Sequence, residues 1–281
     1  MHDPFDFNPK PKQFTVIGHP IEHSLSPQIH RKFARQADVS LVYTKTLGEA
    51  GGFNQAVQHF MASDGAGVNV TVPFKLDAFA LCDSITDRAR TAGAVNTIWF
   101  EEDKIFGDMT DGVGMVRDIE QNQGVELTGK RILVIGAGGA VRGVLQPLLA
   151  ANPSELILCN RTEGTAIELA AEFKHQGNIQ ARAMNDLQGE SFDIIINGTS
   201  ASLSDDLPAV PPSIFKQGCF AYDMMYAHQP TIFMKWAMNK GAGKVSDGLG
   251  MLVEQAAVGF EIWHGKTVNT APVIENLRQG V

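Results

Sequence analysis

The stretch that most constrains the fold is residues 130–149, KRILVIGAGGAVRGVLQPLL. It opens with four apolar residues at 132–135, a run typical of a strand buried on both faces of a parallel sheet. Glycines follow, and the apolar residues after them recur at the spacing of one helical face: Val141, Val144, Leu145, Leu148 and Leu149. A strand, a glycine turn and a helix in this order are typical of a pyrophosphate site. Glycine lets the backbone approach the ligand, and the helix begins with unpaired N–H groups.

The glycine pattern is incomplete, because Val141 stands where the usual GxGxxG pattern has its third glycine. A turn that binds nothing is therefore an alternative. A second predicted strand over 155–159 favours the nucleotide interpretation, and it ends in Asn160-Arg161-Thr162. An NAD-binding domain has a carboxylate near this point, whereas a guanidinium pairs with the 2′-phosphate of NADP through charge-assisted hydrogen bonds. The sequence therefore favours NADP.

Composition narrows the class of protein. The 281 residues suffice for two ordinary domains, and 44% hydrophobic with 19% charged residues is typical of a globular protein. A net charge of −8 without a basic cluster argues against nucleic acid. No apolar run approaches the roughly 20 residues of a membrane helix, and the proline-rich lead-in to the first strand lacks signal-peptide features. The three scattered cysteines, Cys82, Cys159 and Cys219, have no zinc spacing, so we expect thiols in a reducing cytoplasm and no metal.

Strands and helices are predicted to alternate along the whole chain. Strands are expected over 14–17, 41–47, 65–73, within 93–100, and over 132–135, 155–159, 192–196 and 220–224, and residues 245–250 are expected to lead back toward the last helix. Helices are expected over 27–37, 55–61, 78–82 and 86–91, after 112 and 139, and as a long closing helix from 251. A hairpin is expected at EEDKIFG (101–107), and a loop at 204–212.

Two places in the first third of the sequence carry residues suited to binding a ligand. Ser24 and Ser26 stand two apart at a predicted helix start, with Ser26 as N-cap and Pro27 in the first helical position. A plain cap accounts for Ser26 but not for Ser24, and two hydroxyls also suit a carboxylate. Lys75 follows the carboxyl end of a predicted strand, where open α/β sheets bind ligands. A solvated surface lysine is the alternative there.

The chain resembles the shikimate dehydrogenase family from about Phe14 to its last helix. The resemblance rests on eight separated motifs in family order: HSLSP (23–27), NVTVPFK (69–75), AGAVNT (92–97), TDG (110–112), GAGGA (136–140), NRT (160–162), YDM (222–224) and DGLGMLVEQAA (247–257). Members of this family are NADP-dependent oxidoreductases that reduce 3-dehydroshikimate on the chorismate pathway of aromatic amino-acid biosynthesis.

The resemblance implies a role for each matching residue. Lys75 and Asp111 would form the catalytic pair, with Lys75 as proton donor and acceptor. Ser24 and Ser26 would hold the substrate carboxylate. The residues implied at the substrate's ring hydroxyls are Thr71, Asn96, Asp111 and Gln255, with Tyr222 lining the same cleft. The residues implied at the cofactor are Gly136, Ala137, Gly138, Gly139 and Ala140 at the pyrophosphate, Asn160, Arg161 and Thr162 at the 2′-phosphate, and Thr199, Met224 and Gly248 along the nicotinamide half.

Two positions depart from the family pattern. Met109 stands where asparagine is common before Thr-Asp, which puts a supporting hydrogen bond in doubt. NGTSAS (197–202) replaces the commoner NATSxG, which puts details of the nicotinamide loop in doubt.

We therefore expect two α/β domains with a cleft between them. The substrate domain would comprise 1–111 and 247–281, and a Rossmann-like NADP-binding domain, 112–246, would be inserted in it. The expected partner is a small molecule, with neither nucleic acid nor membrane, and a homodimer is the assembly considered. Three alternatives stay open. A quinate/shikimate dehydrogenase using NAD or NADP is disfavoured by Arg161. A non-catalytic NADP(H)-binding regulatory module would have no use for Lys75 and Asp111. Another small-ketone reductase would lack the paired serines.

Overall fold

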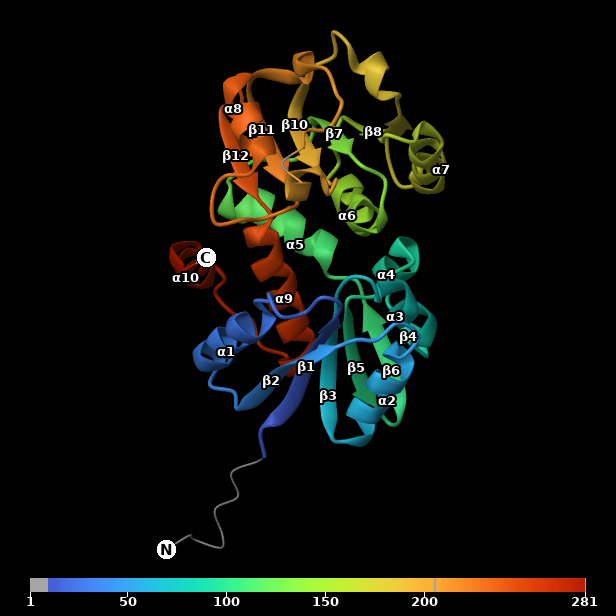
Figure 1. The fold of residues 1–281 in the computed structure, drawn as a ribbon, viewed down its shortest axis with the longest axis vertical. Helices are drawn as coiled ribbons and strands as arrows, with labels where there is room; N and C mark the ends of the chain where they lie inside the picture. Colours follow the sequence, from blue (N-terminus) through green and yellow to red (C-terminus); the bar gives the residue numbers. More distant parts are fainter. Residues whose placement is uncertain (1–9, 205, 281) are drawn as a thin grey trace, which may run out of the picture. The chain divides into compact units, whose positions relative to one another are not determined.

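The structure, a computed structural model, describes residues 10–204 and 206–280, so most of the predicted lead-in, residues 1–9, lies outside it. It has the predicted α/β class and forms two compact units (Figure 1). The first unit comprises residues up to Ala89, Ala94–Asp108 and Gly259–Asn269, and the second comprises the remainder. Helix α9 (Leu249–His264) contributes residues to both units. The predicted domain boundaries stay a prediction.

The first unit is built on a mixed six-stranded sheet in the order β2-β1-β3-β5-β6-β4. Its strands are β1 (Lys12–Gly18), β2 (Leu41–Leu47), β3 (Gly65–Val70), β4 (Ser84–Ile85), β5 (Thr97–Glu101) and β6 (Lys104–Asp108). β1 is parallel to β2 and β3, whereas β5 is antiparallel to β3 and β6. The predicted hairpin joins β5 and β6 through Glu102 and Asp103, both at positive φ, as a two-residue turn requires.

Helices α1 (Ser26–Ala37), α2 (Phe53–Ala62) and α3 (Lys75–Leu81) connect these strands, and α4 (Asp87–Ala92) follows β4. The prediction that Ser26 caps α1 is wrong. Leu25 already has helical backbone angles, and its carbonyl accepts from the N–H groups of Gln28 and Ile29. The helix therefore begins at Ser26, and Leu25 is the N-cap. The strand expected over 65–73 ends at Val70, because Phe74 N–H bonds back to Thr71 and turns the chain into α3.

An aromatic cluster with a histidine at its centre fills the core of the first unit. The His30 ring lies parallel to Tyr43, with 4.5 Å between ring centroids, and tilted against Trp263 at 5.1 Å. Phe14 stacks on Trp263 at 4.6 Å. These side chains come from α1, β2, α9 and β1, so the cluster ties four elements together.

The second unit is built on a wholly parallel sheet in the order β12-β11-β10-β7-β8-β9. Its strands are β7 (Arg131–Ile135), β8 (Glu155–Cys159), β9 (Ile179–Ala181), β10 (Phe192–Asn197), β11 (Phe215–Asp223) and β12 (Lys244–Asp247). Its helices are α5 (Asp111–Arg117), which continues as the π-helix η1 (Asp118–Asn122), then α6 (Gly139–Ala150), α7 (Glu163–Phe173), α8 (Ile232–Asn239) and α10 (Ala271–Gly280). Short 3₁₀ turns lie at Met184–Leu187, Ala201–Ser204 and Pro212–Ile214. The last two fall within or beside the predicted loop.

The central strand β7 is buried on both faces, as its unbroken apolar run predicts. Ile132 and Val134 pack into one core with α6 and α7, and Leu133 and Ile135 pack into a second core that includes residues of α8. The helical positions predicted to face the core, Val141 to Leu149, are buried as well. Among residues 10–204 and 206–280, no helix is both long and apolar enough to span a membrane.

Candidate functional site

The predicted pyrophosphate turn lies at the carboxyl end of β7 in the second unit. Gly136 has φ +115°, and a Cβ there would lie 3.1 Å from the backbone of Gly198, so only glycine fits. Gly138 is the N-cap of α6, and Gly139 is its first residue. A Cβ at either position would meet no atom within 4 Å, so nothing in the packing requires glycine there. The exposed helix N-terminus therefore leaves room for a ligand against the backbone, which fits a pyrophosphate.

The predicted 2′-phosphate residues lie on the next strand end. β8 ends at Cys159, and Asn160 Nδ2 donates to the carbonyl of Thr162 at 3.0 Å, which holds the turn into α7. Arg161 and Thr162 are exposed at this turn. A guanidinium on a turn at the carboxyl edge of the sheet has the charge and the exposure that a phosphate ligand needs.

The three residues predicted along the nicotinamide are joined through the ends of β10, β11 and β12. Met224 N–H bonds to the carbonyl of Asn197 at 2.9 Å, and Thr199 Oγ1 donates to Asn197 Oδ1 at 2.7 Å. Gly248 N–H bonds to the carbonyl of Met225 at 3.0 Å. A Cβ at Gly248 would lie 2.2 Å from the Met224 carbonyl oxygen, so glycine is required at this close approach.

Sequence analysis missed the residue that holds this loop, Asp223. It is fully buried and accepts hydrogen bonds from Asn197 Nδ2 at 3.1 Å and from Ser202 Oγ and Thr231 Oγ1, each at 2.7 Å. Burial raises the pKa of Asp223, and these hydrogen bonds oppose the rise. The NGTSAS segment (197–202), which departs from the family pattern, is therefore anchored at Asn197 and Ser202. The YDM motif contains Asp223, so an aspartate between two apolar residues at a strand end was the available signal.

The predicted carboxylate-binding serines lie together in the first unit. Ser24 Oγ donates to Ser26 Oγ at 3.2 Å, and the Ser26 N–H donates to Ser24 Oγ at 3.4 Å. Ser26 is buried, and Ser24 is partly exposed. The two hydroxyls therefore form one pair at the start of α1, which suits an anion with two oxygens.

Thr71, Lys75 and Asn96 are connected through the backbone at the carboxyl end of β3. Thr71 N–H bonds to the carbonyl of Ile17 at 2.9 Å. Lys75 begins α3, and its carbonyl accepts from Val95 N–H at 3.0 Å, one residue before Asn96. The carbonyl of Asn96 in turn accepts from Val70 N–H at 2.8 Å. Thr71, Lys75 and Asn96 thus lie on neighbouring strand and helix ends of the first unit, which also holds the serine pair.

The other predicted substrate residues belong to the second unit. Asp111 is buried at the first position of α5, and the adjacent Thr110 Oγ1 donates to Gln255 Oε1 at 3.4 Å. A Cβ at Gly114 would lie 2.6 Å from the Gln255 nitrogen, so α5 and α9 pack closely at this point. Asp111 and Gln255 are thereby brought to the same place in the unit.

Tyr222, also predicted at the substrate, is wholly buried in β11. Its hydroxyl donates to Asp118 Oδ2 at 2.7 Å. Burial, followed by the negative charge of Asp118, raises the pKa of Tyr222 well above 10. Burial also raises the pKa of Asp118, against the hydrogen bonds from Tyr222, Asn122 and Gln123. Sequence analysis missed Asp118, which lies at the first position of the π-helix and follows no motif.

Met109, one of the departures from the family pattern, is a core residue. It is 1% exposed, and its Cε would lie 2.3 Å from a Cβ at Gly143 on α6. Gly143 therefore makes the space that the Met109 side chain fills between α5 and α6.

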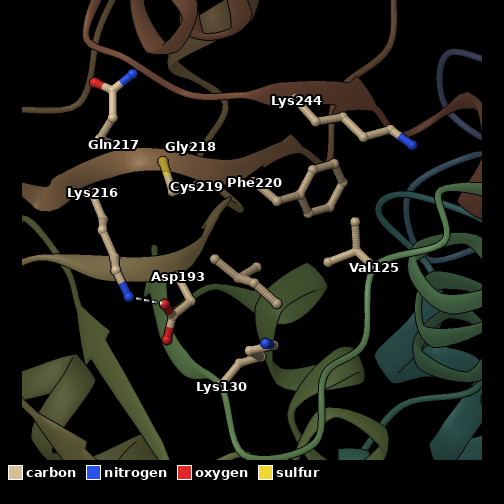
Figure 2. Close-up of a pocket in the computed structure, with 10 residues that line it drawn as sticks. Val125, Lys130, Asp193, Lys216, Gln217, Gly218, Cys219, Phe220 and Lys244 are labelled. Carbon is tan, nitrogen blue, oxygen red and sulfur yellow. Dashed lines mark hydrogen bonds and ion pairs between the residues drawn. The ribbon is translucent and has the colours of Figure 1, made fainter.

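Figure 2 shows a pocket of about 330 Å³ in the second unit, at the amino ends of the strands. Lys130, Lys216, Lys244 and Cys219 are among its lining residues, and Lys216 Nζ pairs with Asp193 at 2.6 Å. None of the predicted site residues lines it, and parallel sheets bind ligands at the opposite, carboxyl edge. This pocket is not the candidate site.

None of the three cysteines is a predicted site residue. Cys82, Cys159 and Cys219 are free thiols, and burial raises their pKa values to about 12, 12 and 11 respectively. Within the described part of the chain, no group of three or more His, Cys, Asp or Glu residues could hold a metal ion.

Comparisons with known proteins match nearly the whole chain. Residues 16–98 match the family model of the shikimate dehydrogenase substrate binding domain, 118–204 that of shikimate/quinate 5-dehydrogenase, and 248–278 that of the shikimate 5′-dehydrogenase C-terminal domain. The shikimate dehydrogenase (NADP(+)) of Hahella chejuensis is 49% identical over 267 residues, which are 95% of this chain and 98% of the relative.

Two solved structures share the fold. An Ael1 enzyme from Pseudomonas putida has a TM-score of 0.91 at 42% identity, covering 95% of this chain and 98% of its own. Shikimate 5-dehydrogenase from Thermus thermophilus, solved in complex with NADP(H) and shikimate, has a TM-score of 0.87 at 31% identity, covering 96% and 100%. The predicted family and fold class are confirmed: the chain belongs to the shikimate dehydrogenase family.

Proposed function

We propose that this chain catalyses the reversible, NADPH-dependent reduction of 3-dehydroshikimate to shikimate. The observation that carries the proposal is the 49% identity to an NADP(+)-dependent shikimate dehydrogenase over almost the full length of both chains. The reaction class and the cofactor predicted from the sequence are those that the relative's name states.

The second unit would hold the cofactor, and the local geometry fits it. The open N-terminus of α6 at Gly138 and Gly139 suits the pyrophosphate, together with the backbone of Gly136, Ala137 and Ala140. Exposed Arg161, with Asn160 and Thr162, would pair with the 2′-phosphate. The joined strand ends that carry Thr199, Met224 and Gly248 would bind the nicotinamide half. When bound, NADPH supplies the hydride for the ring ketone.

Lys75 would move the proton of the reaction. Reduction of a ketone places negative charge on the carbonyl oxygen, so a cation that can donate a proton stabilises the transition state there. The Lys75 ammonium supplies both at the N-terminus of α3. Asp111 would orient that ammonium and accept the proton back in the reverse direction.

The remaining predicted residues would bind the substrate. The Ser24–Ser26 hydroxyl pair would hold the carboxylate, which keeps its charge throughout the reaction and so contributes to affinity more than to rate. Thr71, Asn96, Asp111 and Gln255 would bond the ring hydroxyls, whereas Tyr222 is wholly buried and donates its hydroxyl to Asp118, so it would not contact the substrate. We further propose a cytoplasmic enzyme that acts on small molecules alone, as a homodimer.

The test offers the purified protein shikimate or quinate, each with NADP⁺ or NAD⁺, and follows reduced cofactor by its absorbance. The proposal expects turnover of shikimate with NADP⁺ that exceeds the other three combinations. Equal turnover of quinate or with NAD⁺ would favour the broader quinate/shikimate dehydrogenase, which one matching family model also names. Binding of NADPH without any turnover would favour the regulatory module.

A further inference from the structure

A chain of buried hydrogen bonds crosses the first unit from its aromatic core to a predicted substrate residue. Tyr43 Oη donates to Asn69 Oδ1 at 2.6 Å, and Asn69 Nδ2 donates to Thr97 Oγ1 at 3.3 Å. Thr97 Oγ1 donates to Asn96 Oδ1 at 3.1 Å. The four residues are at most 7% exposed, and they come from β2, β3, β5 and the segment before β5. Of these, only Asn96 matches a residue that the family resemblance places at the substrate.

Every donor in this chain points the same way, and the phenol sets the direction. A protonated tyrosine hydroxyl that donates to Asn69 must meet the amide oxygen, so the amide nitrogen of Asn69 faces Thr97. The Thr97 hydroxyl receives that hydrogen and directs its own proton to the oxygen of Asn96. The Asn96 amide is thereby oriented with its oxygen toward the core and its nitrogen on the opposite side.

Two features keep the phenol in its donor role. Burial raises the pKa of Tyr43 well above 10 although a side-chain hydrogen bond with Ser26 opposes the rise, so the hydroxyl keeps its proton at physiological pH. The His30 ring lies parallel to the Tyr43 ring at 4.5 Å with Asn69 beside it, and among the described residues no hydrogen bond joins the imidazole to the phenol. His30 therefore packs against Tyr43 without competing for the hydroxyl.

We propose that Tyr43 and Thr97 are positioning residues for substrate recognition: through Asn69 they orient the Asn96 amide so that its nitrogen donates to a non-reacting ring hydroxyl of shikimate. The inference rests on the proposed function, because it assigns the orientation of one of that function's substrate contacts. An amide held in one orientation discriminates a ring that carries this hydroxyl from one that lacks it.

The first experiment measures kcat and KM for shikimate at saturating NADP⁺ in Thr97→Val and Tyr43→Phe. Valine has the shape of threonine but can neither receive from Asn69 nor donate to Asn96, so the Asn96 amide loses its orientation. We expect KM to rise about tenfold in Thr97→Val and about threefold in Tyr43→Phe, with kcat changed less than about twofold. Thr97→Ser keeps the hydroxyl and should restore KM.

Thr15→Val is the matched control. Thr15 is also a fully buried threonine of the same sheet, and its hydroxyl pairs with Thr46 Oγ1 at 2.9 Å, outside the chain of four. It should lower thermal stability about as much as Thr97→Val does and leave the KM for shikimate unchanged. An equal rise of KM in both variants would overturn the proposal, because general loosening of the sheet would then explain it.

The deciding experiment uses shikimate analogues that lack one non-reacting ring hydroxyl, at C4 or at C5. In the wild type, removal of the hydroxyl read by Asn96 should raise KM about tenfold. In Thr97→Val, the same removal should cost almost nothing, because the contact is already lost. If Thr97→Val still turns over shikimate and its KM rises for both analogues as much as in the wild type, the inference is overturned. A wild type that does not oxidise shikimate would instead remove the proposed function, and this inference with it.

Discussion

The two units solve the same problem, a sheet covered by helices, with different interiors. In the second unit the central strands carry isoleucine, leucine and valine on both faces, and the polar groups collect at the strand ends. In the first unit the core itself is polar in part: His30, Tyr43, Asn69 and Thr97 are all buried. Aliphatic side chains in an interior need only to fit one another in shape. Buried hydrogen-bond donors and acceptors must also face their partners, because a buried polar group left unpaired destabilises the fold. The comparison fits the proposal that the first unit orients substrate groups, and that the second presents backbone to a cofactor and adds Asp111 and Gln255 to the substrate contacts.

The largest effect is expected at Lys75 of the first unit, the lysine that we propose as the proton donor. Lys75→Ala should lower kcat by at least about 10²-fold with little change in KM, because a general acid acts in the transition state. Lys104→Ala, at an exposed position at the start of β6, is the control and should be active. Steady-state kinetics with shikimate and NADP⁺ measure both. A kcat that survives Lys75→Ala would remove this residue from the mechanism and weaken the division of labour between the units.

The polar core should make the first unit sensitive to acid. Burial lowers the pKa of His30 from 6.5 to about 3, and burial together with Lys12 and Lys266 lowers the pKa of His264 to about 4. Both histidines stay neutral when folded but take up a proton when unfolded. Stability is therefore complete above about pH 6.5 and falls as the pH drops toward these folded-state pKa values. For His30 alone the loss at pH 4.5 is on the order of 2–3 kcal/mol.

Urea unfolding at pH 7 and pH 4.5 measures this loss. Trp99 and Trp263 report on the first unit, and Trp236 reports on the second. His30→Phe should flatten the pH dependence of the first-unit signal. Proton NMR of the wild type provides a check that needs no variant: titration of the His30 ring above pH 5 would contradict the prediction.

Cofactor choice should depend on the second unit alone. Arg161→Ala should raise the KM for NADP⁺ about ten- to hundredfold and leave that for NAD⁺ unchanged, since a charged hydrogen bond to the 2′-phosphate contributes about 1.5–3 kcal/mol. Lys174→Ala removes an exposed charge beyond the end of α7 and serves as the control. Equal losses with both cofactors in Arg161→Ala would show that Arg161 does not recognise the phosphate.

The smallest effects are expected in the glycine turn of the second unit. Substitutions there distinguish a glycine that the backbone requires from one that faces the ligand. Gly136→Ala should cost about 1–3 kcal/mol of stability, because φ is +115° and the Gly198 backbone is close. Gly138→Ala has room and φ −84°, so it should leave stability unchanged and raise the KM for NADP⁺ a few-fold. Thermal melts and cofactor kinetics of the two variants decide this. Equal stability losses would show that both glycines serve the turn alone.

Much of the chain could be predicted because its signals are local. The apolar run at 132–135, the helical spacing after it and the hairpin at 101–107 depend on neighbouring residues, and the structure confirms all three. The motifs also identified the family, and with it the enzyme class and NADP. The start of α1 was predicted wrongly by one residue, because serine is a good cap while the local backbone already turns at Leu25.

What only the tertiary structure decided is which distant side chains meet. Nothing near Asp223 in the sequence announces that Asn197, Ser202 and Thr231 bond to it, and nothing near Tyr43 predicts the path through Asn69 and Thr97 to Asn96. Such contacts form when strands pair across long separations in the chain, so no local period or spacing encodes them. The sequence by itself determined the two α/β layers, the family and the residue types of the site. The direction of each buried hydrogen bond followed only from the fold, because a donor's partner is defined by position in space.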